Sequence, residues 1–341
     1  LEDPGVRLGD TGEARIAVTL AGDEVTDIFR HVHVPEEWQR AEQERASLGA
    51  IVTNVCGFPV GLGLLAGAVA GLVGWSRGRF ARGTFAIAFG GLVGVLALRV
   101  FNAWPLLTAS FDTTRPWTQQ TLIGLGSGLV GAGFLAALLA LIAGFVHRWL
   151  PPGDPAPVAA RVLRGAALGT AWAGVSAVAT AFTPAVDPLW GALSSAGTTL
   201  PWVGPALEAL RGWAMQTLML LLLVGLAGRL TRGGTSRLGV AAALLVISGL
   251  VLSGAGGVET LGLWVISGLG TGVVLCVSWL LVLRFQPSVL PAATAAMGVL
   301  ALFRESALAA YPGASTGAAV AVALLGALAV WWVGRIEADA A

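Results

Sequence analysis

The chain has 341 residues, of which 56% are hydrophobic and only 11% are charged, and its formal net charge is +1. Soluble domains carry about 25% charged residues, so most of this chain is expected to lie in lipid. All the basic residues are arginines, which excludes a Schiff-base lysine, and they are too sparse to neutralise the phosphates of a nucleic acid. We therefore predict an all-α polytopic membrane helix bundle with about eight or nine transmembrane helices, no nucleic-acid partner and no cofactor.

The first 47 residues differ from the rest, because eleven of the nineteen carboxylates precede Leu48. Apolar and polar side chains alternate over residues 14–34 on either side of Gly22-Asp23, which predicts a small β-hairpin. Two strands alone are marginally stable in water. We therefore expect residues 14–47 to rest on upstream sequence, on the membrane domain or on a protein partner.

A helix is predicted to begin at Pro35-Glu36-Glu37, because proline suits a first helical turn and carboxylates suit the positive end of the helix dipole. Its charged part runs through Arg45 and is expected to lead directly into the first membrane span. A span needs about 20 apolar residues. We count nine candidate spans, at about 48–74, 84–101, 120–146, 162–182, 212–229, 238–254, 261–283, 288–303 and 316–334.

The eighth segment contains Pro291 and ends at Arg304-Glu305, so a re-entrant or tilted segment is an alternative there. The proline-rich stretch 151–160 predicts a stiff inner linker that separates the first three spans, within 48–150, from the remaining six, within 161–335. The proline-rich and tryptophan-containing stretch 183–211 is interpreted as an outer cap with short interfacial helical turns.

Loop charge predicts the orientation of the chain. Alternate loops are rich in arginine: Arg77, Arg79 and Arg82; Arg148, Arg161 and Arg164; Arg229, Arg232 and Arg237. The loops between them are not basic. The positive-inside rule then places the arginine-rich loops in the cytoplasm of a multi-pass cell-membrane protein. The hairpin of residues 1–47 is expected to be extracytoplasmic and the tail 336–341 cytoplasmic.

Glycines at helical spacing predict close packing between helices. Gly126 to Gly131 match GxGxxG, but a dinucleotide site requires a preceding strand and this segment lies inside a span. We interpret it, with other small residues four apart, as a face that lets helix backbones approach. The candidate packing positions are Gly63, Gly67, Gly71, Gly124, Gly128, Gly268 and Gly272.

His31 and His33 are the candidate metal ligands, since residues two apart on a strand share a face and could bind zinc together with Glu36 or Glu37. Zinc sites in proteins use at least three protein ligands, and no further histidine lies nearby in the sequence. We therefore favour a solvated or partner-facing surface and predict no metal site.

Charged residues near span ends form a second candidate site. Ionisable groups at membrane depth are functional candidates. Arg99, Glu208, Arg211, Arg304 and Glu305 could meet in one outer vestibule. Such a cluster could bind a polar ligand or fix the outer loops, and we favour the second interpretation because charge costs little near span ends.

Polar residues within the spans are expected to form hydrogen bonds between helices rather than a substrate path. They are Asn54, Gln216, Ser253, Ser267, Thr271 and Ser278. The two cysteines, Cys56 and Cys276, are interpreted as small buried hydrophobic residues because neither belongs to a CxxC pair.

Phe29 to Arg40, leading directly into a glycine-rich bundle, resembles the leader of some bacterial CPBP proteins, the CAAX-protease-like intramembrane metalloproteases. The loop Asn102-Ala103-Trp104-Pro105 is similar in character. The resemblance implies a Glu-Glu-x-x-x-Arg helix and histidine motifs, yet in the single Glu36-Glu37 pair Arg40 comes one position too early. His147 is the only histidine after Leu48, and no asparagine lies four residues after it. No catalytic residue is therefore carried over.

These observations favour a non-catalytic, CPBP-like membrane protein that acts as a binding, scaffolding or accessory subunit. A transporter of small molecules or lipids is the first alternative, because Pro291 and glycine-rich segments allow a broken helix near the midplane. An intramembrane CAAX-type protease whose catalytic part lies outside this chain is the second. A polar cavity at mid-depth would favour transport, whereas a filled bundle with an exposed strand edge near residues 25–34 would favour a partner role.

Overall fold

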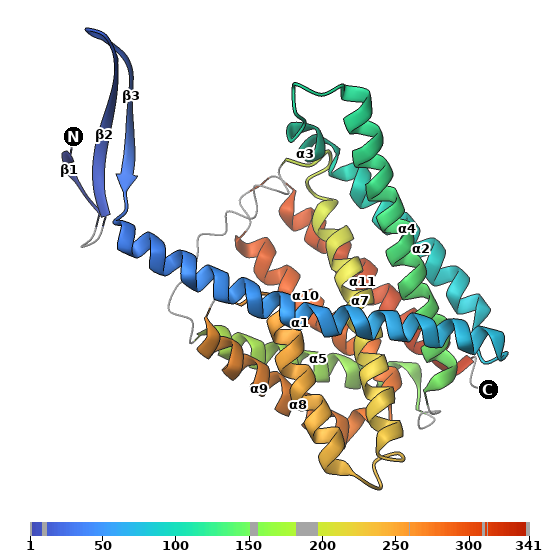
Figure 1. The fold of residues 1–341 in the computed structure, drawn as a ribbon. Coiled ribbons are helices and arrows are strands. Elements are labelled where there is room, and N and C mark those ends of the chain that lie inside the picture. Colours follow the sequence, from blue (N-terminus) through green and yellow to red (C-terminus); the bar gives the residue numbers. More distant parts are fainter. Residues whose placement is uncertain are drawn as a thin grey trace.

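A computed structural model describes residues 2–8, 12–150, 156–181, 197–258, 260–308, 311 and 313–338. It consists of long apolar helices packed into a bundle, with a small β-sheet at the N-terminus (Figure 1). Eight of its helices are long and apolar enough to cross a membrane, which confirms the predicted class of polytopic helical membrane protein.

The sheet has three antiparallel strands in the order β1-β2-β3, comprising β1 (Glu2–Leu8), β2 (Gly12–Ala21) and β3 (Glu24–His33). The predicted hairpin is confirmed as β2 and β3, and its turn contains Gly22 at φ 69°. The sequence reading did not include β1, whose register with β2 is irregular. The sheet stands away from the helix bundle and joins it through the start of α1 (Figure 1).

Helix α1 (Glu36–Ser76) is continuous over 41 residues and contains Pro59 without ending there. Its length is about 60 Å, roughly twice the hydrocarbon thickness of a bilayer, so it is longer than a membrane span requires. Arg40 pairs with Glu36 at 2.7 Å within its charged first turns. The predicted helix after Pro35 therefore does lead directly into the first span.

The remaining helices follow in chain order. They are α2 (Arg82–Asn102), α3 (Trp104–Ala109), α4 (Trp117–Trp149), α5 (Val158–Ala181), α7 (Gly204–Leu230), α8 (Leu238–Ala255), α9 (Leu261–Ser278) with its π-helical end η1 (Trp279–Leu283), the 3₁₀ turn η2 (Pro287–Val289), α10 (Leu290–Leu308) and α11 (Ala314–Ala338). Helices α7, α10 and α11 pack together in the interior, and α5 packs along α10 (Figure 1).

Helix α5 is 24 residues long but is not among the eight span-like helices. The contacts on either side of α5 nevertheless show that the chain passes from one end of the bundle to the other in this region. Trp149, at the end of α4, lies under Arg229, which is near the last residue of α7. Leu200, just before the start of α7, binds Asn102 and therefore lies at the other end of the bundle. The chain therefore changes ends between Trp149 and Leu200, and α5 is the helix described in that interval.

The eighth predicted segment forms a full helix, because Pro287–Ala307 is long and apolar enough to cross a membrane. Pro287 and Pro291 lie in its first turns, where a missing N–H leaves no helical hydrogen bond unmade. It is also the most enclosed of the eight span-like helices. Its length and apolar composition favour a full span over the re-entrant alternative.

The two predicted halves of the bundle pack against each other. Helices α2 and α4 contact α7, and α1 contacts α8. The linker residues 151–155 and the cap residues 182–196 lie outside the described residues. Residues 204–211, which we assigned to the outer cap, instead form the start of α7, so this helix begins eight residues earlier than the predicted span.

Candidate functional site

The two ends of the bundle differ in charge. One end collects arginines from distant parts of the sequence: Arg161 donates to the carbonyl of Val333 at 3.1 Å, and Arg164 donates to Gln286 Oε1 at 2.7 Å. Arg229 lies over the Trp149 ring at this same end. The N-terminus of α2 is here too, because Gly83 lies beside the Arg335 guanidinium.

At the opposite end, Glu208 of α7 bridges two arginines. Arg99 Nε of α2 lies 3.0 Å from Glu208 Oε2, and Arg211 donates to Glu208 Oε1. All three side chains are partly exposed. The C-terminal end of α2 is thus joined by charge to the N-terminal end of α7, an arrangement that suits the fixing of the segments at this end of the bundle.

Arg304 and Glu305 do not join this cluster. Both are exposed on α10, and neither forms an ion pair within the described part of the chain. Glu305 instead borders a hollow of about 10 Å³ beside Pro205 and Tyr311, which is too small for a polar ligand. Three of the five candidate residues therefore come together and two do not.

Asn102 holds the segment before α7, a role that the sequence reading missed. Its Oδ1 accepts from the Leu200 N–H at 2.8 Å and its Nδ2 donates to the Leu200 carbonyl at 3.3 Å. The Thr199 N–H donates to the Asn102 carbonyl at 2.9 Å. No motif marks such a contact, because the partners are about a hundred residues apart.

Asp112 closes the turn between α3 and α4. Its Oδ1 accepts from both the N–H and the hydroxyl of Thr114, at 2.9 and 2.8 Å. These two hydrogen bonds lower the pKa of the Asp112 carboxyl below its ordinary value. Gln120 holds the same turn through the backbone of Asp112.

Polar side chains inside the bundle are used to join helices. As the sequence predicts, Ser253 and Ser267 share a hydrogen bond at 2.8 Å between α8 and α9, and Ser278 accepts from Trp172 Nε1 at 2.8 Å. A buried pair that the sequence reading missed joins Thr217 and Thr294, whose hydroxyls lie 2.6 Å apart. These hydrogen bonds join α8 to α9, α5 to α9, and α7 to α10.

The seven candidate packing glycines all lie against a neighbouring helix. A Cβ at Gly67 would come 2.7 Å from Leu222 Cδ1, and one at Gly71 would come 2.7 Å from the Leu141 carbonyl oxygen. On α9, a Cβ at Gly272 would lie 2.6 Å from Val246 Cα of α8. Close neighbours are also found at Gly63, Gly124, Gly128 and Gly268.

The GxGxxG match lies inside α4 and does not follow a strand. Of its glycines, Gly128 packs against Val100, whereas Gly126 and Gly131 have open space where a Cβ would lie. Of the three glycines in this match, only Gly128 therefore lies at a close contact between helices.

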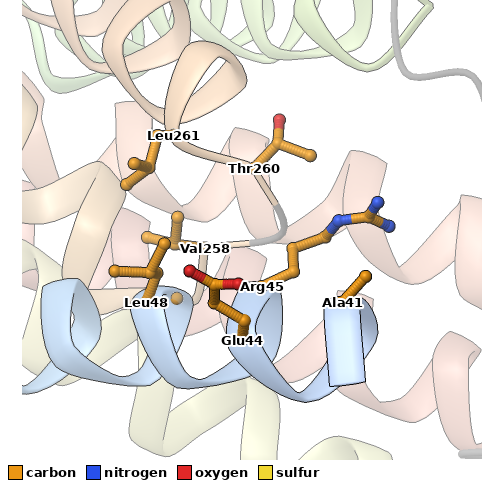
Figure 2. A pocket seen from close by; sticks show the side chains of 8 residues that line it. Ala41, Glu44, Arg45, Leu48, Val258, Thr260 and Leu261 are labelled. Atoms are coloured by element: carbon orange, nitrogen blue, oxygen red, sulfur yellow. The ribbon is translucent and has the colours of Figure 1, made fainter. Parts of the chain in front are cut away.

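A surface hollow of about 320 Å³ lies where the charged part of α1 passes the loop between α8 and α9. Figure 2 shows Glu44 and Arg45 projecting from α1 towards the loop that carries Val258 and Thr260. Leu48 and Leu261 give it an apolar floor. The hollow opens to the surface beside the charged start of α1.

The candidate metal ligands lie on the exposed sheet. His31 and His33 are two apart on β3, opposite Arg15 and Glu13 of β2. Over the described residues, no group of three or more histidine, cysteine, aspartate or glutamate side chains is placed to hold a metal ion.

The sheet has one apolar and one mixed face. In the β2–β3 register Val18 lies opposite Ile28 and Ala14 opposite Val32. Because side chains alternate along a strand, one face collects apolar residues, with Arg30 among them. We call it the apolar sheet face, and it comprises Ala14, Ile16, Val18, Leu20, Val25, Ile28 and Val32, since a register shift after Thr19 brings Val25 opposite Leu20.

The apolar sheet face is open to solvent. Leu20 is 62% exposed and Ile28 is 63% exposed. Every residue of β3 is exposed except His33, which is partly buried. A contiguous exposed apolar face indicates a site of interaction with a protein or with a membrane.

Comparison with protein-family models, with curated protein sequences and with solved structures found no match to this chain. The resemblance of residues 29–40 to the CPBP leader therefore stays a prediction. The inferences that follow rest on the geometry of the chain itself.

Proposed function

We propose that this chain is a membrane-embedded binding or scaffolding subunit that engages a protein through its N-terminal sheet. The observation that carries the proposal is the apolar sheet face, which is held outside the bundle on the charged start of α1 (Figure 1). A sheet that served only its own fold would be expected to cover this face, because exposed apolar area of this kind is a cost in water.

The interior of the bundle supports the same proposal. Trp213, Thr217 and Thr294 direct their polar atoms at one another or at backbone carbonyls of α10. Transport would need a polar path at mid-depth, usually beside a broken helix. In the described helices these polar groups instead form hydrogen bonds within the protein, mainly between helices.

We also propose an orientation for the protein in the cell membrane. The end that holds Arg161, Arg164 and Arg229 is taken as cytoplasmic by the positive-inside rule. The sheet and the Arg99–Glu208 pair then face the extracytoplasmic side. A CPBP-like, non-catalytic descent would agree with this arrangement.

The proposal is tested by purifying the full chain from its native membrane in mild detergent and identifying what accompanies it. Wild type is compared with the Leu20→Ser/Ile28→Ser variant, which makes the apolar sheet face polar. The control is Val130→Ser on α4, a change on a 74% exposed lipid-facing position. We expect one protein in fixed proportion with wild type and with the control, and its loss with the sheet variant. Equal recovery with all three would contradict the proposal.

A further inference from the structure

The free edge of β3 is a regular strand template. Strand β3 lies at one side of the sheet, and its ladder with β2 is unbroken from Asp27 to His33. Every second residue of an edge strand points its N–H and C=O away from the sheet, where another strand can bind them. The other edge is β1, whose register is interrupted. The β3 edge is therefore the better place for strand addition.

Charge is distributed unevenly along this edge. The acidic residues Glu24 and Asp27 lie in its first half, whereas Arg30, His31 and His33 lie in its second half. A parallel neighbour of the same sequence would put like charges opposite each other. An antiparallel copy puts the acidic half of one strand opposite the basic half of the other, so the edge is complementary to itself.

We propose that the partner at this edge is a second copy of the chain, paired β3 to β3 in the antiparallel sense and centred on Phe29. The proposal goes beyond the proposed function and does not depend on it, because it concerns the free edge of β3 rather than the apolar sheet face. A two-fold axis between two antiparallel copies of one strand places a central residue opposite its own copy. Residues at equal distances before and after the central residue are then paired with each other.

The possible two-fold centres on β3 differ in the residue pairs that they create. A centre at Arg30 would place two arginines opposite each other, and a centre at Ile28 would place Asp27 opposite Phe29. A centre at Phe29 places Asp27 opposite His31 of the other copy, twice. Phe29 and His31 are already neighbours on one face, with ring centroids 5.6 Å apart. This centre thus gathers four aromatic rings, and it places each Asp27 carboxylate opposite an imidazole of the other copy.

The first test is disulfide trapping of the full chain in detergent. Directly opposite residues have Cα atoms about 4.5–5.5 Å apart, which is within disulfide range. We expect Phe29→Cys to give a cross-linked dimer under mild oxidation. Val25→Cys is the matched control, because it is similarly exposed on the same strand but lies far from its own copy in this register. The unmodified chain controls for Cys56 and Cys276. Cross-linking at Val25 equal to that at Phe29, or none at Phe29, would overturn the proposal.

The second test exchanges the charges. We expect Asp27→Lys to weaken dimerisation about tenfold, because the carboxylate opposite each His31 is lost and a cation then faces the basic half of the other strand. The double variant Asp27→Lys/His31→Asp places opposite charges across the edge and should return the dimer to within about threefold of wild type. The measurement is sedimentation equilibrium of the detergent-solubilised chain. A dimer indifferent to Asp27→Lys, or no rescue in the double variant, would refute the register.

The two proposals can fail separately. A chain that is monomeric and does not cross-link at Phe29, but still recovers a different protein through Leu20 and Ile28, refutes self-pairing and leaves the proposed function standing. A chain that dimerises at Phe29 but retains every partner after the Leu20→Ser/Ile28→Ser change supports self-pairing and contradicts a docking role for the apolar sheet face.

Discussion

The indole N–H of Trp213 donates to the backbone carbonyl of Pro291 at 3.0 Å, and this hydrogen bond joins α7 to the start of α10 inside the bundle. The Trp213 ring also packs edge-on against Trp332 of α11, with centroids 5.4 Å apart. The Thr294 hydroxyl donates to carbonyls of the same turn, at Leu290 and Pro291. Helices α7, α10 and α11 therefore meet at one buried, hydrogen-bonded point.

The Thr217–Thr294 pair next to this point should contribute measurably to stability. We expect Thr217→Val and Thr294→Val each to lower the free energy of unfolding by about 1 kcal/mol, and the double variant to cost less than the sum, because both remove the same bond. The measurement is reversible unfolding in mixed micelles. The control is Thr170→Val, whose hydroxyl bonds only to Ala166 of its own helix on an exposed face. If the two single-variant losses of unfolding free energy added up to the loss in the double variant, this would count against a direct Thr217–Thr294 hydrogen bond.

Two glycines of α9 provide a matched pair for the packing account. A Cβ at Gly272 would press against the backbone of α8, whereas one at Gly270 would meet nothing within 4 Å. We expect Gly272→Ala to destabilise the protein by about 1–3 kcal/mol through overpacking. Gly270→Ala should be neutral or slightly stabilising, since alanine favours the helix. Thermal unfolding in detergent distinguishes them, and equal effects would show that α8 and α9 are not this close.

The outer charges should act unequally. Glu208 joins Arg99 and Arg211, whereas Glu305 has no ion-pair partner in the described part of the chain. We expect Glu208→Ala to lower stability by about 0.5–1 kcal/mol, which is modest because the side chains are half exposed. Glu305→Ala should change it by less. The comparison is made by thermal unfolding at low and high salt, and the Glu208 effect should shrink with salt. A larger effect at Glu305 would contradict the assignment.

Asp112 gives a pH prediction for the turn before α4. Hydrogen bonds from Thr114 hold its pKa below the ordinary value of 3.8, so folding stabilises the charged form. The contribution of the Asp112 carboxylate to the free energy of folding is fully present above its ordinary pKa. This contribution is lost as the pH falls through the lowered pKa of the folded state. The Thr114 amide signal in NMR should therefore titrate with a midpoint below 3.8.

Thr114→Ala removes the hydroxyl donor and should raise that midpoint, whereas Thr113→Ala should not move it. A wild-type midpoint at or above the ordinary value would show that the turn does not form in solution.

Features carried by local sequence could be predicted. The alternation on either side of Gly22, the proline and carboxylates at the start of α1 and the long apolar segments each specify their own element. The packing glycines were found for the same reason, since their spacing alone places them on one helix face.

Features that depend on which helices become neighbours could not be predicted. The Asn102–Leu200 contact, the Thr217–Thr294 pair and the separation of Glu305 from Glu208 each depend on tertiary placement. The start of α7 was also misjudged. Pro201 and Pro205 suggested an irregular cap, but Pro205 lies in the first turn of the helix, where proline is tolerated.

The most direct test of the central claim is site-specific photo-cross-linking in native membranes. A benzophenone side chain is placed at Leu20 on the apolar sheet face, and at Val130 on the lipid-facing side of α4 as the control. The account predicts a discrete protein adduct at Leu20 and lipid adducts alone at Val130. Lipid adducts alone at both positions would mean that the sheet lies on the bilayer, and the partner-binding account would be wrong.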